Sequence, residues 1–351
     1  METLISSLQP QIVFPILHAS DVAAARRAGQ KLADGLGFSE VHAGRLAIVI
    51  TEAGTNILKH AGEGTLYVMR AQSAAQPASQ SSADMAGIDV LAVDSGPGIA
   101  DVEGSLRDGV STAGTAGTGL GALRRQADDF DVWSARGKGA AFFMRIWNGT
   151  PRARSCAMEI GALVVPLAGE DVSGDGWAVS CNTDGATLLG VDGLGHGPEA
   201  HKAAAGAIEA LERRPGASPS DTLQAAHEAL RTTRGAALSA ARIDYAAGEL
   251  RFAGIGNVSG VVVDGESRRA MVSHNGIVGN NMRKVQEFPI GFPPGALCIL
   301  HSDGVQTQWD LDDYPGLFAR APAIVAGSLM RGYIRRRDDA MVLVARRGGH
   351  P

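Results

Sequence analysis

Glycines beside acidic or amide residues recur where apolar runs end, and they form a different set in each half of this chain. The first set comprises a polar run with Glu52 and Asn56, the turn Asp94-Ser-Gly-Pro-Gly98, and the glycine-rich residues 114–121. The second set consists of aspartates at four separate sites: Asp175, Asp192, Asp303 and Asp338. Because the two sets do not overlap within 351 residues, we expect two domains of ordinary size.

The composition is that of a folded globular protein, with 45% hydrophobic and 20% charged residues. The net charge of −5 provides no basic surface, so we expect no nucleic-acid partner. Three widely spaced cysteines without a C-x-x-C pair argue against a disulfide framework and a zinc site, and they suit a reducing compartment. The first residues lack a signal-peptide pattern and no apolar run is long enough to cross a bilayer, so we expect a cytoplasmic protein with no membrane partner.

Apolar periodicity in the first half predicts an α/β domain over residues 1–148, followed by a polar linker at 149–157. Strands are expected at residues 11–17, 65–70, 88–93, 131–134 and 140–147. Helices are expected at residues 20–36, 39–62 and 119–128. Residues 71–86, rich in Ala, Ser and Gln, are expected to form a long exposed loop between paired strands.

The second half, residues 158–351, changes to short strand patterns separated by glycines. Strands are expected at residues 160–166, 176–182, 186–191, 237–245, 249–254, 258–264, 295–301 and 340–346. Two helices are expected among them, at residues 198–213 and 220–232. Paired strands with two central helices favour a layered α/β sandwich.

The polar run of the first half has helical spacing. Glu52, Asn56 and Lys59 stand at i, i+4 and i+7, so they share one helix face. A carboxylate beside an amide suits general-base chemistry next to a magnesium ion, because the amide oxygen is a hard ligand that leaves room for phosphate oxygens and water.

The two glycine turns complete this pattern. Asp94 ends an apolar run, and a carboxylate there can accept a hydrogen bond from an exocyclic amine such as that of adenine. The glycines Gly96 and Gly98 allow the backbone to approach a flat base closely. Further on, three glycines open a predicted helix whose N-terminal amides favour phosphate: Gly117, Gly119 and Gly121. Each element alone could be scaffold, but all three in this order favour a site for ATP and Mg²⁺.

In this order the motifs resemble the N, G1 and G2 boxes of the GHKL ATPase superfamily, over about residues 17–147. The run from Asp94, with Asp108-Gly-Val-Ser-Thr112 and Thr118-Gly-Leu120, resembles the RsbT-like serine kinases of bacterial partner-switching systems. The resemblance implies a Bergerat-type α/β sandwich in which Glu52 activates a protein hydroxyl. It implies the following nucleotide and magnesium contacts: Asn56 for Mg²⁺, Asp94 for adenine, and Lys59, Gly96, Gly98, Gly117, Gly119, Leu120 and Gly121 for the rest of ATP.

The aspartates of the second half stand where strands are expected to end. Asp192 and Asp303 each follow an apolar run and Asp338 precedes one. Hydrolysis of a phosphate ester by two hard metal ions needs several aspartates from distant strands, with a bridging water as nucleophile. The Gly193 carbonyl could face the same ions as Asp192. A single Asp-Gly is more simply a turn, but the recurrence of the pattern, with Asp175 included, favours a two-metal centre.

These motifs resemble the PPM-type, SpoIIE-like serine/threonine phosphatases, and most closely the small RsbX-like branch, over about residues 158–346. Further matches are Arg234-Gly-Ala-Ala, Gly254-Ile-Gly-Asn257-Val and His274-Asn-Gly-Ile-Val-Gly279. The resemblance implies an αββα-like sandwich in which Asp192 bridges two Mn²⁺ or Mg²⁺ ions. It also implies that Asp303 and Asp338 complete the coordination of one ion and that Asp175 orients metal-bound water.

One departure concerns the residues after Asp338-Asp339, where Ala340-Met341 replaces the hydroxyl residue that such phosphatases usually carry. A role for Asp339 in metal binding is therefore open. His196 and His301 flank the aspartates, and structural histidines are the simpler interpretation.

The favoured hypothesis is a bifunctional regulator of partner switching, with an ATP-dependent Ser/Thr kinase half and a phosphoserine/phosphothreonine phosphatase half. The resemblances imply a STAS-domain antagonist as substrate, a stressosome-like assembly, a downstream phosphatase or sigma-factor regulator, and a part in the stress response. A second hypothesis makes the first half an ATP-binding regulatory or anti-sigma-type sequestering module that controls the phosphatase. Glu52 favours catalysis, because sequestration needs no base. A pure scaffold is the third hypothesis, and the acidic residues argue against it.

Overall fold

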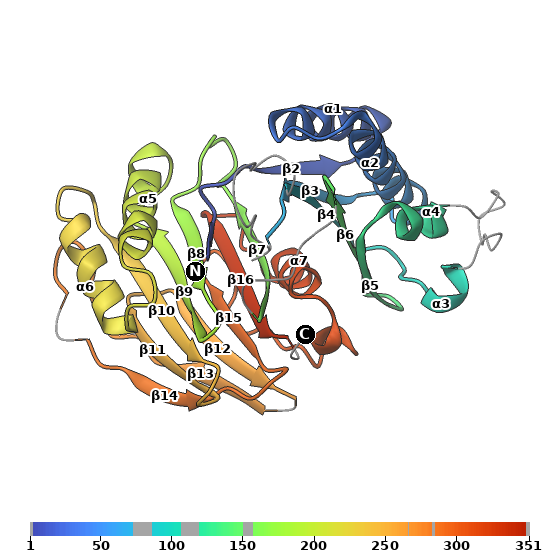
Figure 1. Ribbon diagram of the computed structural model, residues 1–351. Coiled ribbons are helices and arrows are strands. Elements are labelled where there is room, and N and C mark those ends of the chain that lie inside the picture. The colour runs from blue at the N-terminus through green and yellow to red at the C-terminus, as the bar shows by residue number, and fades with distance from the viewer. Residues whose placement is uncertain are drawn as a thin grey trace.

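The computed structural model describes residues 3–72, 86–106, 119–149, 157–265, 267–282 and 285–348. Across the molecule the layers follow in the order helices, sheet, helix α7, sheet, sheet and helices (Figure 1). The first helices and the first sheet come from the first half of the chain, and the remaining layers come almost entirely from the second half. The predicted fold class, an α/β sandwich followed by an αββα-like sandwich, is confirmed.

The first-half sheet is antiparallel, and its strands are neighbours in the order β2-β3-β4-β6-β5. Their bounds are β2 (Gln11–Ile16), β3 (Gly64–Arg70), β4 (Gly87–Asp94), β5 (Asp129–Ala135) and β6 (Gly139–Trp147). The helices are α1 (Ala19–Gly35), α2 (Glu40–His60), the short α3 (Val102–Ser105) and α4 (Gly119–Gln126). One face of the sheet forms a buried core with α1, α2 and α4.

Helix α2 follows directly from its sequence. The Ser39 hydroxyl caps its first turn by accepting from the His42 amide at 3.4 Å. Gly62, with φ of +80°, follows its last turn. Leu46 and Ile50 are buried as their helical spacing predicts. The helix is therefore fixed against the sheet, with its polar residues on the remaining surface.

The second half contains two sheets that pack face to face over a shared apolar core. One has the order β1-β8-β9-β10-β11-β14 and the other β13-β12-β15-β16-β7. The bounds of the first sheet are β1 (Thr3–Ser6), β8 (Asp175–Cys181), β9 (Gly185–Gly193), β10 (Ala236–Asp244), β11 (Glu249–Ile255) and β14 (Phe288–Gly291). Those of the second are β7 (Met158–Val165), β12 (Ser259–Asp264), β13 (Ser267–Met271), β15 (Leu297–His301) and β16 (Ala340–Arg347).

Helices cover both outer faces of these paired sheets. α5 (Pro198–Arg213) and α6 (Pro219–Ala229) pack on the sheet that contains β8 to β10. On the other side, the 3-10 turn η1 (Leu317–Ala319) leads into α7 (Pro322–Tyr333), which packs on β7 and β16.

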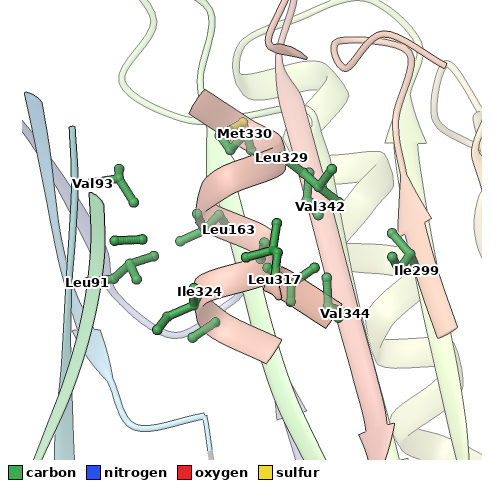
Figure 2. Packing of buried hydrophobic residues seen from close by; sticks show 14 of the residues in the cluster. Leu91, Val93, Leu163, Ile299, Leu317, Ile324, Leu329, Met330, Val342 and Val344 are labelled. Atoms are coloured by element: carbon green, nitrogen blue, oxygen red, sulfur yellow. The ribbon is translucent and has the colours of Figure 1, made fainter. Parts of the chain in front are cut away.

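Helix α7 is buried between the two halves of the molecule. Figure 2 shows Leu91 and Val93 of β4 on one side of it and Val342 and Val344 of β16 on the other. Gly327 makes the close approach possible, because a Cβ atom at this position would lie 2.8 Å from Leu91 Cδ2. The two halves thus share one continuous core, and α7 is its central element.

The strand β1 crosses from the start of the chain into the second half. Residues Thr3 to Ser6 pair antiparallel with Cys181 to Ala178 at the edge of β8. The chain then enters the first-half sheet at Gln11. The first half is therefore attached to the sheets of the second half at its beginning as well as by the chain that continues into β7.

Two glutamine side chains cover the free edge of β7. Gln72 donates to the Ala162 carbonyl and accepts from the Ala162 amide, both at 2.7 Å. Gln11 makes the same two kinds of bond with Val164, donating to its carbonyl and accepting from its amide at 3.3 Å. Unpaired strand edges invite pairing with other chains, so these side chains take the place of a neighbouring strand.

The predicted strands and helices agree with the structure to within a few residues, but β1, β13, β14, α3 and α7 were not predicted. The predicted exposed loop and the linker fall mainly on residues 73–85 and 150–156, outside the described residues. The expectation of reduced cysteines is wrong for Cys181, which is disulfide-bonded. Cys298 is a buried free thiol.

Candidate nucleotide and metal sites

The polar residues of α2 lie on its less buried side. Glu52 and Asn56 are half-buried, and Lys59 is exposed. The Asn56 Nδ2 atom is itself buried and has no hydrogen-bond partner in the described part of the chain. A buried N–H donor without a partner is a position that an acceptor atom of a ligand can satisfy, whereas the predicted binding of Mg²⁺ would use the amide oxygen of the same side chain.

Asp94 is the last residue of β4, and the backbone fixes its carboxylate. Its Oδ1 atom accepts from the Gly96 amide at 2.8 Å and from the Ala140 amide at 3.3 Å. Burial raises the pKa of Asp94, and these two hydrogen bonds together with the positive charge of Arg331 oppose the rise. The side chain is only 9% exposed, so it is presented to a ligand in one orientation.

The turn after Asp94 is packed tightly, which explains its glycines. A Cβ on Gly96 would lie 2.7 Å from the Ala61 Cβ, just beyond the end of α2. Gly98 has φ of +76°, and a Cβ there would lie 2.1 Å from the Ala135 carbonyl oxygen. The turn is wedged between α2 and the β5–β6 hairpin, so its glycines serve packing in the structure.

The last predicted nucleotide residues lie at the start of α4. Gly119, Leu120 and Gly121 form its first turn, and α4 packs against α2. Arg45 of α2 secures this arrangement, because its guanidinium donates to the Gln126 carbonyl at 2.6 Å. Gly117 lies outside the described residues.

Sequence reasoning missed Arg331, which comes from α7 in the second half. Its Nη1 atom donates to the backbone carbonyl of Asp94, 237 positions away in the chain. No local pattern marks such a residue, because its role depends on how the two halves pack.

Asp175 and Asp192 stand opposite each other in the register of β8 and β9. Asp175 is 5% exposed, and its Oδ2 atom has no hydrogen-bond partner in the described residues. Burial and then the charge of Asp192 hold the pKa of Asp175 well above its usual range, while a hydrogen bond with Ser302 opposes the rise. Burial, followed by the charges of Asp303 and Asp338, raises the pKa of Asp192 to about 7.

The other predicted ligands surround this pair. Asn257 Nδ2 donates to Asp303 Oδ2 at 2.6 Å. Asp338 is exposed at the end of the segment that follows α7. Gly193 ends β9, and its amide donates to the Gly174 carbonyl at 3.0 Å. Asp175, Asp192, Asp303 and Asp338 are thus brought into one electrostatic cluster from four separate segments.

Asp339 has a structural role that the sequence left open. Its Oδ1 atom accepts from the Leu167 amide at 2.7 Å and its Oδ2 atom from the Gly174 amide at 2.6 Å. The side chain is 2% exposed. Both oxygens therefore anchor the backbone that leads into Asp175, and they are already occupied.

Ser302 and Asn257 were missed as members of the acidic cluster. Ser302 is fully buried, its Oγ accepts from the Met341 amide at 2.9 Å, and it interacts with Asp175. His301 is a buried structural histidine, as expected, with Trp309 Nε1 donating to its Nε2 at 3.1 Å. His196 also has a protein partner, because its Nδ1 lies 2.5 Å from Glu170 Oε1, although its side chain is 54% exposed.

The acidic cluster has the chemistry of a cation site. Four carboxylates gathered in this way, two of them buried with a raised pKa, would be stabilised by divalent ions, which favour oxygen ligands. In the residues that the structure describes, however, no three His, Cys, Asp or Glu side chains already have the geometry of a metal site.

Comparison with known proteins finds a matching protein family for each half of the chain. The model of the histidine kinase-like ATPase domain family matches residues 16–146. The serine/threonine-protein kinase RsbT of Bacillus subtilis (strain 168) is 34% identical over 119 residues, which are 34% of this chain and 83% of RsbT. The chain belongs to the RsbT serine/threonine-protein kinase family. The model of the stage II sporulation protein E (SpoIIE) family matches residues 183–348 of the same chain.

Two solved structures are similar to this RsbT-family chain. One comes from a study of the bacterial stressosome, described as a modular system that has been adapted to control secondary messenger signalling. It is 29% identical with a TM-score of 0.51, and the match covers 54% of this chain and 99% of that one. The PP2C phosphatase domain of SpoIIE from Bacillus subtilis, with a fragment of its regulatory domain, is 19% identical with a TM-score of 0.49, over 95% of this chain and 94% of that one.

The predicted combination of a kinase-like ATPase domain with a SpoIIE-type phosphatase domain is confirmed. The chain is an enzyme of the partner-switching type. No helix in the described ranges combines the length and apolar character that a membrane crossing requires.

Proposed function

We propose that this chain sets the phosphorylation state of one small partner protein by two opposed activities. Residues 1–148 would transfer a phosphoryl group from ATP to a Ser or Thr hydroxyl, and residues 158–351 would hydrolyse the resulting phosphate ester, with 149–157 as the linker. The observation that carries this proposal is the presence in one chain of a kinase-family domain and the Asp175–Asp192 cluster.

In the kinase half, three residues would have distinct roles. Glu52 would accept the proton of the attacking hydroxyl as that oxygen forms its bond to the γ-phosphorus and ADP leaves. Asn56 would hold Mg²⁺, which neutralises charge on the phosphates. Asp94 would accept from the adenine amino group, and its fixed orientation supports this role. The remaining contacts to ATP would come from Lys59, Gly96, Gly98, Gly117, Gly119, Leu120 and Gly121.

In the phosphatase half, the acidic cluster would hold two Mn²⁺ or Mg²⁺ ions. Asp192, the Gly193 carbonyl, Asp303 and Asp338 would be the groups that hold these ions. Such ions supply a nucleophilic water and stabilise the phosphate charge. The raised pKa of Asp192 supports the assignment, because its excess negative surroundings favour cations. Asp175 would orient the metal-bound water through its free Oδ2 atom.

We infer that the partner is a STAS-domain antagonist within a stressosome-like assembly of the cytoplasm. The similarity to RsbT and to a protein from the stressosome study supports this inference. A downstream phosphatase or sigma-factor regulator would then respond to the partner's phosphorylation state, as part of a stress response.

A second candidate function is favoured by the contact between Arg331 and Asp94. In this reading the first half binds ATP without transferring phosphate and only regulates the phosphatase. The packing of α7 against both halves supports communication between them in either case.

The deciding experiment incubates the full chain with ATP, Mn²⁺ and the STAS protein encoded nearest its gene, followed by phosphosite mapping by mass spectrometry. Asp192→Ala protein should drive the partner to its phosphorylated form, and Glu52→Ala protein should leave it unmodified. Partner that stays unmodified with Asp192→Ala protein would favour the regulatory function. A phosphorylated residue that the wild type never dephosphorylates would show that the two halves serve different substrates.

A further inference from the structure

The last turn of α7 reaches into the nucleotide half. Arg331 donates to the Asp94 backbone carbonyl, and its charge opposes the effect of burial on the Asp94 carboxylate. Its guanidinium also lies 5.8 Å from the Trp133 ring centroid and 6.0 Å from that of Tyr314. Gly139 leaves room for it, because a Cβ there would lie 2.7 Å from Nη1. A residue of the phosphatase half therefore contacts the Asp94 backbone and lies close enough to influence its carboxylate.

The chain that leaves α7 is bound to the acidic cluster. The Arg335 amide donates to the Gly304 carbonyl at 2.8 Å, and Ile334 pairs with Val305 in a β-bridge. Gly304 directly follows Asp303, and three residues after Arg335 the same segment reaches Asp338. One short segment thus begins at the nucleotide site and ends at two of the proposed metal ligands.

We propose that Arg331 is a positioning residue of the nucleotide site and that the segment 331–338 couples nucleotide binding to the phosphatase centre. The inference rests on the proposed function of both sites. A nucleotide that shifts Asp94 would shift Arg331, and through it the Asp303 turn and Asp338. Because linkage is reciprocal, occupation of the acidic cluster would also change nucleotide affinity.

The opposite end of α7 supplies a matched control. Arg320 forms an ion pair with Asp131 at 3.3 Å, and the Ala321 amide donates to the same carboxylate at 2.7 Å. Arg320 is thus also an arginine of the second half that contacts the first-half sheet, but it has no contact with Asp94 among the described residues. A general loss of interdomain packing would affect both arginines, whereas a specific role would affect Arg331 alone.

The test uses the full chain as wild type, Arg331→Ala, Arg331→Lys and Arg320→Ala. Calorimetry with Mg²⁺ and ADP measures nucleotide affinity, and p-nitrophenyl phosphate hydrolysis with and without ADP measures coupling. We expect Arg331→Ala to weaken ADP binding about fivefold or more, the lower range of allosteric coupling, and to remove the effect of ADP on the KM or kcat of hydrolysis. Arg331→Lys, which can still donate to the carbonyl, should recover part of the ADP affinity and part of the ADP effect on hydrolysis. Arg320→Ala should retain the wild-type ADP affinity and the wild-type ADP effect.

Equal ADP affinities for Arg331→Ala and Arg320→Ala would overturn the inference, as would a wild-type hydrolysis rate that ADP does not change. Asp94→Asn is included to separate this failure from that of the proposed function. If the wild type and Asp94→Asn both fail to bind ADP, the nucleotide site itself is wrong and the inference falls with it.

Discussion

Asp175 and Asp192 are directly opposed cross-strand neighbours on β8 and β9, and burial, together with the charges of neighbouring aspartates, raises the pKa of both carboxyl groups. Like charges placed opposite each other destabilise a sheet. The folded chain therefore binds protons at this site more strongly than the unfolded chain does. Protons and metal ions would compete for the same oxygens.

This competition predicts the pH dependence of stability. The contribution of Asp192 is fully present below its unfolded-state pKa near 3.8 and is lost as the pH rises through about 7. Metal-free protein should therefore melt several degrees lower at pH 8 than at pH 5, and added Mn²⁺ should raise the melting temperature more at pH 8. Asp192→Asn should show a weaker pH dependence in differential scanning calorimetry. An equal pH dependence in the variant would contradict the assignment.

The fixed carboxylate of Asp94 leads to a prediction for nucleotide affinity. Asp94→Asn replaces the acceptor for the adenine amino group, so ADP binding should weaken by about 10–100-fold, as for the loss of a hydrogen bond to a charged group. Glu52→Ala should leave most of the binding intact and abolish phosphoryl transfer. Calorimetry and a radiolabel transfer assay separate these effects. Comparable affinity losses in the two variants would be inconsistent with their assigned roles.

Hydrolysis should depend on both Asp192 and a divalent cation. Asp192→Ala should stop turnover of p-nitrophenyl phosphate, and a chelator should abolish wild-type activity that Mn²⁺ or Mg²⁺ then restores. Asp184→Ala is the matched control, because Asp184 is an exposed aspartate beside a glycine in the loop between β8 and β9. Full activity in chelator would exclude the two-metal mechanism.

Two adjacent residues of α7 should respond in opposite directions to substitution. Gly327→Val would place side-chain atoms against Leu91 and Val93, so it should destabilise the chain by about 1–3 kcal/mol. Ser328→Ala removes a buried hydroxyl that has no partner in the described residues, so it should be neutral or stabilising. Urea denaturation measures both. A Gly327→Val protein as stable as the wild type would show that α7 is not tightly packed between the halves.

The sequence predicted most strands and the helices α1, α2 and α5, because their apolar residues recur with a clear period. It did not predict α7, since residues 322–330 are all buried and a helix that is buried all round has no polar face. The pairing of β1 was also missed, because four residues carry little pattern and their partner lies more than 170 positions away.

The residues of the candidate sites likewise divide into those that local sequence predicts and those that depend on long-range packing. The motif aspartates Asp175, Asp192 and Asp303 could be selected from their positions beside glycines and strand ends. The role of Asp339 depends on the Leu167 and Gly174 amides, and that of Arg331 on interdomain packing, so neither could be read from local sequence. Long-range packing decides which polar groups meet.

The pairing of β1 with β8 makes the kinase-like half an insertion within the phosphatase-like fold, anchored at both of its ends. A domain anchored in this way and joined through the α7 core cannot swing like an arm on a hinge. A bound substrate could not be carried from one active site to the other, so it would have to dissociate, reorient and bind again. Between the two reactions the partner would be free in solution, and the enzyme would set the average phosphorylation of a whole pool rather than cycle a single captive molecule.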